Sequence, residues 1–318
     1  MNKPSLAIVV PCYNEQEVIE HSNQRLHQVL NELISEEKIS TSSKIYYVDD
    51  GSRDSTWEKL LKLSTTSKQI TLVRLSRNKG HQNALYAGLC ETIEDAIVSI
   101  DADLQDDPEN IKAMVDEYIK HADVVYGVRN ERSSDSFFKR FTAEGYYHVM
   151  NKMGVDLVFN HADFRLMSRR ALDAFKEYPE SNLFLRGIVR EIGFKSASVE
   201  YQRKERLAGE SKYPLRKMLS FAWDGITSFS TAPLRLITIL GITSSIISLA
   251  CIVWVLCIRL FSDLAIPGWT SILLPLLFIG SVQLLSLGVI GEYLAKLYKE
   301  VKKRPKYHIS EIIGKEKH

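Results

Sequence analysis

The sequence predicts an α/β protein in which a doubly wound parallel sheet is followed by membrane-associated helices. Through about residue 127, short apolar runs alternate with segments of helix length. Polar residues, many of them acidic, directly follow several of these runs, and two long uncharged stretches lie in the C-terminal third. Such alternation is typical of a parallel sheet covered by helices. Uncharged stretches of this length are typical of membrane spans.

The strands of the sheet are expected at the short apolar runs, which are Leu6–Val10, Lys44–Val48, Ile70–Leu75, Ala96–Ile100 and Asp123–Gly127. Helices are expected between them, at about Glu15–Ile34, from about Asp54, at Gly80–Ile93 and from Pro108. Ser52 or Asp54 is suited to cap the second helix. Pro108 fits the first turn of the fourth, where a proline is tolerated.

Composition excludes several classes of protein. The chain has 318 residues and a net charge of +2, so it lacks the basic field of a nucleic-acid-binding protein. Its four cysteines form no CxxC motif and no disulfide framework. The N-terminus lacks the apolar core of a signal peptide, and we therefore expect the first domain to stay in the cytoplasm.

Asp101 and Asp103 stand directly after the fourth predicted strand. Residues i and i+2 of an extended segment point the same way, so both carboxylates can converge on one point. Ligands of open α/β sheets bind at the carboxyl ends of the strands. Two carboxylates there suit Mg²⁺ or Mn²⁺ carrying a diphosphate. A solvated turn is the alternative, because Asp is common after strands.

Other strand ends also carry polar groups. Asn14 and Glu15 follow the first strand, Asp49 and Asp50 the second, and Arg77-Asn78-Lys79 the third. This set suits a nucleotide held by carboxylates and amides, although Asn14 and Glu15 could instead cap the first helix. Neither GxxxxGK[ST] nor GxGxxG is present, so a P-loop ATPase or a dinucleotide-dependent dehydrogenase is not supported.

The C-terminal third predicts a membrane hairpin. Residues 236–258 and 264–291 contain no charge, and spans are expected at about 236–258 and 268–291. Basic residues before the first span and after the second place both ends in the cytoplasm. Between the predicted sheet domain and the first span, Leu215–Ser230 has apolar residues at helical spacing, which predicts an amphipathic helix at the membrane surface or one packed on the domain.

Several motifs together resemble the GT-A-fold glycosyltransferases of family 2. They are Val10-Pro11-Cys12-Tyr13-Asn14-Glu15, the stretch Val48 to Asp54, Asp101-Ala102-Asp103-Leu104-Gln105-Asp106, Arg77-Asn78-Lys79-Gly80-His81, Asp163-Phe164-Arg165-Leu166-Met167, Arg206 to Tyr213 and Lys303-Arg304-Pro305-Lys306-Tyr307. The full set, from about residue 5 to 308, is similar to the polyisoprenyl-phosphate subgroup. That subgroup includes bactoprenol glucosyltransferases and, more distantly, dolichyl-phosphate mannose synthases.

The resemblance implies specific roles. Asp101, Asp103 and Asp163 would be catalytic, and Asp103 with Asp101 would hold Mg²⁺ or Mn²⁺. The nucleotide-sugar site would comprise Pro11, Tyr13, Asn14, Glu15, Asp50, Lys79, Asp101 and Gln105. The acceptor phosphate would meet Arg129, Arg132, Ser134, Arg165, Arg206 and Lys212. Asp163 would lie beside the reacting sugar, although an ion pair with Arg165 is the plain alternative.

Two of these regions also have ordinary explanations. Basic and hydroxyl residues between Arg129 and Arg140 can bind a phosphate, but most such runs are solvated loops. The stretch Gly209–Tyr213 is either a lid from which Lys212 could close over the donor phosphates or a plain linker.

The implied domains are a catalytic domain at 1–212, an interface helix at 213–232, a hairpin at 233–296 and a basic cytoplasmic tail at 297–318. The implied reaction is inverting transfer of one hexose to undecaprenyl phosphate at the inner (plasma) membrane. The preferred sugar is glucose, with UDP-glucose as its donor. The segment Gln202–Arg206 lacks the Trp of processive synthases, which favours a single transfer.

Alternatives are another donor (GDP-mannose, UDP-GlcNAc or a modified pentose) and a non-catalytic membrane scaffold or flippase. The resemblance also implies a downstream flippase and a second glycosyltransferase that modify a surface glycan such as lipopolysaccharide O antigen. Gly280, Gly288 and Gly291 would allow close helix packing in a homo-oligomer.

Overall fold

The computed structural model describes residues 3–129, 161–178, 185–202 and 269–314, together with residues 234, 237–243, 246–247 and 250. The described residues belong to two compact units. The sheet unit contains all the described strands, and the helical unit contains one long helix, α10 (Trp269–Val301).

The described part of the chain forms one eight-stranded sheet in the order β7-β5-β6-β4-β1-β2-β3-β8. The bounds are β1 (Leu6–Cys12), β2 (Lys44–Asp49), β3 (Ile70–Leu75), β4 (Ala96–Ser99), β5 (Val124–Arg129), β6 (His161–Ser168), β7 (Ser196–Tyr201) and β8 (Ile309–Ile313). Only β6 and β8 run antiparallel to their neighbours. The five predicted strands are confirmed, and β6, β7 and β8 are additions that the sequence pattern did not indicate.

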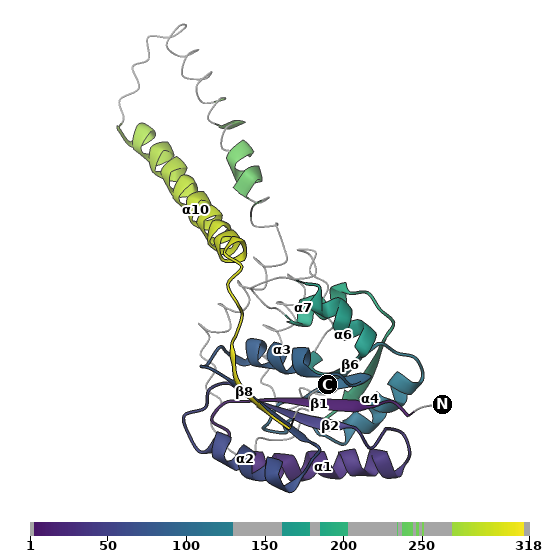
Figure 1. Ribbon diagram of the computed structural model, residues 1–318. Coiled ribbons are helices and arrows are strands. Elements are labelled where there is room, and N and C mark those ends of the chain that lie inside the picture. Colours follow the sequence, from purple (N-terminus) through teal and green to yellow (C-terminus); the bar gives the residue numbers. More distant parts are fainter. Residues whose placement is uncertain are drawn as a thin grey trace, which may run out of the picture. The chain divides into compact units, whose positions relative to one another are not determined.

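Helices cover both faces of the sheet. Their bounds are α1 (Ile19–Ser35), α2 (Thr56–Thr66), α3 (His81–Glu91), α4 (Asn110–Ile119), α6 (Arg169–Lys176) and α7 (Leu185–Glu191). Helices α3 and α6 lie on one face, and α1 and α2 on the other (Figure 1). Helix α1 buries Ile19, Leu26, Leu30 and Leu33, and this spacing keeps one apolar stripe against the strands.

Helix α3 approaches the sheet unusually closely. A Cβ on Gly88 would lie 2.5 Å from Val9 Cγ1 and 2.6 Å from Val48 Cγ2. Only glycine fits there, so the α3 backbone rests directly on β1 and β2. The helix begins after Gly80, and this packing therefore fixes its first residues at the carboxyl ends of those strands.

The C-terminal segment returns to the sheet instead of ending as a simple basic tail. Strand β8 pairs antiparallel with β3, and the Ser76 backbone N–H donates to the His308 carbonyl over 2.9 Å. Lys306 Nζ lies 4.2 Å above the Tyr86 ring, which belongs to α3. The segment after α10 is thus part of the sheet unit.

The helical unit contains one described segment, Phe278–Val301 within α10, that is long and apolar enough to cross a membrane. The predicted span at 268–291 falls largely in α10. The predicted span at 236–258 lies mostly outside the described residues, and the interface helix at 213–232 lies wholly outside them. The two-helix hairpin is therefore not shown.

Candidate active site

The carboxyl edge of the sheet brings together most of the predicted site residues that the structure describes. The loops after β1, β2 and β4 lie at this edge because those strands are parallel. Strand β6 runs in the opposite direction beside β4, with Ser99 opposite Arg165, so its beginning reaches the same edge. This arrangement brings Asp163 close to Asp101 although they are far apart in sequence.

The loop after β4 holds its carboxylates with a strained turn. The Leu104 N–H donates to the Asp101 carbonyl, and Leu104 has a φ of 48°. Positive φ is unfavourable for a branched side chain and is concentrated at functional sites in proteins. Asp103 Oδ1 accepts the Gln105 N–H over 3.2 Å, and Gln105 is 8% exposed.

Asp163 is held by two side chains. Its Oδ1 accepts Arg165 Nη2 over 3.3 Å, and its Oδ2 accepts Gln82 Nε2 over 3.2 Å. Arg165 is fully buried and also donates to the Leu185 carbonyl. Arg165, expected to meet the acceptor phosphate, is thus observed buried in β6 with its guanidinium bonded to Asp163. The ion-pair alternative for Asp163 and Arg165 is observed.

His81 belongs to this site although the sequence analysis assigned it no role. Its Nε2 lies 3.6 Å from Asp101 Oδ1 and 3.7 Å from Asp163 Oδ2. The residue follows Gly80 at the start of α3, the helix whose position Gly88 fixes. Gln82, on the same turn, was also missed. The only available signal was the presence of His81 in the Arg77–His81 motif.

Burial and neighbouring acids together raise the pKa of Asp101. The pKa of Asp101 is raised to about 6: burial is the largest cause, His81 opposes the rise, and the carboxylates of Asp163, Asp106 and Asp103 contribute to it. A carboxyl group with this pKa is poised for a cation, because a bound cation stabilises its ionised form.

The loop after β1 contacts the loop after β2. Pro11 is buried, whereas Tyr13 is 39% exposed. Asn14 has a φ of 55°, donates its N–H to Ser52 Oγ and accepts the Arg53 N–H on its side chain. Helix α1 begins at Ile19 with Val18 as its N-cap residue, and the Glu15 carbonyl accepts the Ile19 N–H. The loops after β1 and β2 are thus tied together.

Asp50 shapes the neighbouring loop. Its two carboxylate oxygens accept the backbone N–H groups of Lys79 and Gly80 over 2.7 and 2.8 Å. Gly51 has a φ of 68°, and a Cβ there would lie 2.8 Å from the Asn78 nitrogen. Burial raises the pKa of Asp50, and those two backbone bonds oppose that rise. The observed role of Asp50 is to fix the entry to α3.

Arg129, predicted to meet the acceptor phosphate, ends β5 and pairs with Asp106. Its side chain is 28% exposed. The other predicted acceptor residues Arg132, Ser134, Arg206 and Lys212 lie outside the described residues.

The donor set at the end of β4 fits a hard divalent cation. Asp101 and Asp103 are oxygen ligands, and the Asp101 side chain is 43% exposed. Among the described residues no group of three His, Cys, Asp or Glu side chains could hold a metal by itself. A cation bound here would complete its shell with water and a phosphate ligand, as Mg²⁺ commonly does.

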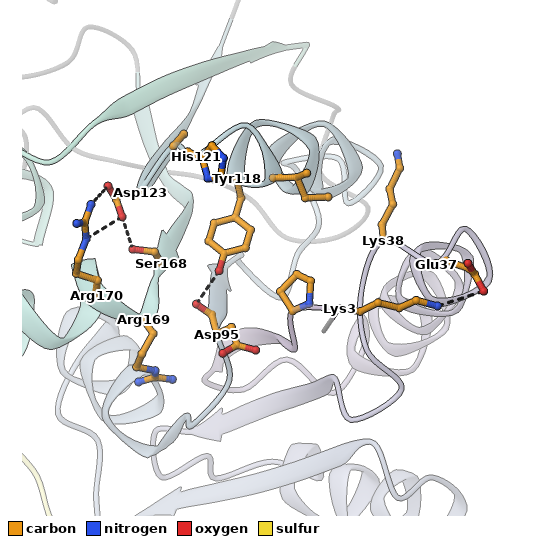
Figure 2. A pocket seen from close by; sticks show the side chains of 13 residues that line it. Lys3, Glu37, Lys38, Asp95, Tyr118, His121, Asp123, Ser168, Arg169 and Arg170 are labelled. Carbon is orange, nitrogen blue, oxygen red and sulfur yellow. Dashed lines mark hydrogen bonds and ion pairs between the residues drawn. The ribbon is translucent and has the colours of Figure 1, made fainter. Parts of the chain in front are cut away.

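The opposite edge of the sheet has a different character. A hollow of about 810 Å³ lies there, and Figure 2 shows its lining side chains, among them Asp123, Ser168 and Arg170. The Asp123 carboxylate accepts hydrogen bonds from Arg170 and Ser168, and Lys3 forms an ion pair with Glu37 (Figure 2). These charges neutralise one another locally.

The fold and the acidic carboxyl edge together define a GT-A-type transferase. Residues 7–175 match the glycosyl transferase family 2, and the chain belongs to this family. It is 49% identical over 310 residues to the uncharacterized glycosyltransferase YkoT of Bacillus subtilis, covering 97% of this chain and 92% of that one. The protein is therefore a glycosyltransferase.

Two further likenesses are informative. The chain is 38% identical over 305 residues to the bactoprenol glucosyl transferase of Shigella phage SfX, covering 96% of this chain and 98% of that one. The crystal structure of mannosyl-3-phosphoglycerate synthase from Rubrobacter xylanophilus has a TM-score of 0.50 at 16% identity and covers 75% of each chain, which is a likeness of fold alone.

Proposed function

We propose that this glycosyltransferase moves a single hexose to undecaprenyl phosphate at the cytoplasmic face of the membrane. The proposed sugar is glucose, and the proposed donor is UDP-glucose. The observation that carries the proposal is the 38% identity to a bactoprenol glucosyl transferase over 96% of the chain. The match extends beyond the sheet unit and includes the apolar C-terminal third, where a lipid-linked acceptor would be met.

In the proposed reaction a phosphate oxygen of the acceptor attacks the anomeric carbon of the sugar. The bond from that carbon to the donor diphosphate breaks, UDP leaves with the electron pair, and the configuration inverts. A phosphate monoester has a second pKa near 6 and is largely dianionic at neutral pH, so it needs little help from a base. Asp163, already bonded to Arg165 and Gln82, is assigned to positioning.

The charge of two approaching phosphates must be compensated. Asp101 and Asp103 would hold Mg²⁺ or Mn²⁺, and the bound metal would neutralise charge on the departing diphosphate. Tyr13 and Asn14 would contact the nucleoside, and Arg129 would meet the acceptor phosphate from the other side.

The return of the chain through β8 supports a hairpin anchor. Strand β8 follows α10 and pairs with β3 in the sheet that carries the site. The segments before and after the helical unit therefore lie on the same side of any membrane. If α10 crosses the bilayer, the chain must cross it an even number of times, so we propose a second span within residues 233–268.

The test is a transfer assay with the full-length protein in detergent or vesicles. Radiolabelled UDP-glucose, GDP-mannose and UDP-GlcNAc are each supplied with undecaprenyl phosphate and Mg²⁺ or Mn²⁺. We expect one donor, UDP-glucose, to give a label that extracts with the lipid, and a chelator to abolish it. Absence of lipid-linked label with every donor would refute the proposal. Turnover that the chelator leaves unchanged would refute the proposed role of the metal ion.

A further inference from the structure

We propose that Asp106 and Tyr201 are positioning residues that hold the Arg129 guanidinium toward the acceptor phosphate and connect it to the loop of Asp101 and Asp103. This inference rests on the proposed function, because the acceptor phosphate is part of that proposal. It assigns a role to two residues that do not contact the reacting atoms.

The three side chains form a compact cluster. Arg129 Nη2 lies 3.0 Å from Asp106 Oδ1 and 3.3 Å from Oδ2, and Arg129 Nε lies 3.3 Å from Oδ1. Tyr201 Oη donates to Asp106 Oδ1 over 2.6 Å and accepts Arg129 Nε over 3.3 Å. Each member therefore contacts the other two.

Burial makes the cluster rigid. The Asp106 side chain is 3% exposed and Tyr201 is 4% exposed. Burial and the adjacent Asp106 carboxylate raise the pKa of Tyr201, so its hydroxyl stays protonated and acts as a donor. A buried carboxylate needs both partners, because losing one leaves charge unsatisfied in a poorly solvated place.

The pairing leaves one part of Arg129 available. Asp106 and Tyr201 use its Nε and Nη2, while Nη1 makes no hydrogen bond to any of the described residues. A guanidinium presents its donors in one rigid plane, so it can keep the carboxylate and offer Nη1 to a phosphate. A lysine ammonium could not hold both in fixed directions.

The cluster also joins the elements that must act together. Asp106 lies three residues after Asp103 in the same loop, Arg129 ends β5 and Tyr201 ends β7. The Tyr201 ring packs edge-on against Phe164 at 5.5 Å, and Phe164 is the neighbour of Asp163. Fixing Arg129 therefore fixes the acceptor side relative to the cation-binding loop.

The opposite edge supplies a matched control. There Ser168 Oγ donates to Asp123, which pairs with Arg170. Tyr201→Phe and Ser168→Ala each delete one hydroxyl from an Asp–Arg–hydroxyl cluster, but only Tyr201 is near the site. Ser168 also caps α6, so Ser168→Ala is expected to lower stability and leave the kinetics unchanged.

The experiment measures KM for the lipid phosphate, KM for the sugar nucleotide, kcat and Tm for wild type, Tyr201→Phe, Arg129→Ala, the double variant and Ser168→Ala. We expect Tyr201→Phe to raise the acceptor KM about ten-fold, with the donor KM within about two-fold of wild type. In the Arg129→Ala background Tyr201→Phe should add nothing, because the tyrosine acts through the arginine.

The outcomes separate the two proposals. If wild type transfers sugar to the lipid and Tyr201→Phe leaves the acceptor KM unchanged, or its effect adds fully to that of Arg129→Ala, the positioning role is refuted and the proposed function stands. A fall in Tm without a change in acceptor KM also refutes it. If wild type transfers nothing to lipid phosphate, both proposals fail.

Discussion

Two clusters, each made of an aspartate, an arginine and a hydroxyl side chain, lie at opposite edges of the sheet. At the carboxyl edge Asp106 pairs with Arg129 and Tyr201, and at the amino edge Asp123 pairs with Arg170 and Ser168. The carboxyl-edge pair is largely buried, whereas the Arg170 side chain is 69% exposed. Similar groups therefore work in very different environments.

The surroundings of the clusters differ still more. Near Asp123 the acids and bases pair with each other, as Lys3 does with Glu37 and Lys38 with Asp116. Near Asp106 the carboxylates of Asp101, Asp103 and Asp163 converge, and burial and their repulsion raise the pKa of Asp101. Folding alone favours the first arrangement, so the second indicates a cation or a polar substrate that belongs there.

The largest expected difference between the edges is catalytic. Asp103→Asn should lower kcat/KM at least about 100-fold, because the amide is a poor ligand for a hard cation. The matched variant Asp123→Asn should stay within about two-fold of wild type, since Asp123 faces no reacting group. Lipid-extractable label measures both, and membrane insertion is checked in parallel. Equal activities in the two variants would contradict the distinction.

A histidine at each edge gives the next comparison. His81 stands between Asp101 and Asp163, whereas His121, which has a φ of 69°, lines the amino-edge hollow. His81→Ala should lower kcat about ten- to 100-fold, because no imidazole would then stand between the Asp101 and Asp163 carboxylates to offset their repulsion. His121→Asn should keep full activity, since Asn tolerates positive φ. A comparable loss in both would show that the effect is structural.

The strands of the sheet differ in how well the sequence predicted them. Strands β1 to β5 and their polar ends followed from apolar runs and parallel-sheet geometry. Strand β6 did not, because Asp163 and Arg165 interrupt its apolar pattern, and only its insertion between β4 and β5 buries that arginine. The burial of Arg165 could not be predicted for the same reason, since burial in a sheet depends on partners distant in sequence.

Contacts made by distant residues account for the other gaps. His81 reaches the acids only because Gly88 lets α3 rest on the sheet, and Arg129 meets Tyr201 across 72 positions. Strand β8 is short and follows a basic segment, and it becomes a strand only because the edge of β3 is open to it. Local pattern carries none of this information.

A smaller effect concerns stability at the carboxyl edge. The pKa of Asp101 is about 6, above its usual value of 3.8, so the folded state binds more protons than the unfolded state between these values. Stability from this group falls as pH rises through that window and stays low above it. Asp101→Asn should therefore raise stability at pH 7 by about 1 kcal/mol, a small value because the side chain is 43% exposed.

Denaturant unfolding at pH 4 and pH 7 tests this effect. The gain from Asp101→Asn should appear at pH 7 and vanish near pH 4, while activity is lost at both. A variant that is destabilised at pH 7 would mean that Asp101 is needed for the fold, and would weaken the contrast with the paired acids of the amino edge. Asp123→Asn, which breaks a satisfied pair, should lose stability at pH 7 under the same conditions.

The smallest expected effect lies at the exposed side of the amino edge. Arg170→Ala removes a guanidinium that is 69% exposed and already screened by water. We expect a Tm within about 2 °C of wild type, because exposed ion pairs contribute little, and unchanged KM values for donor and acceptor. Added salt should erase any remaining difference in Tm, since salt screens exposed charges. A large fall in activity would instead show that the hollow at this edge takes part in the reaction, and the two clusters could no longer be separated into a functional and a structural one.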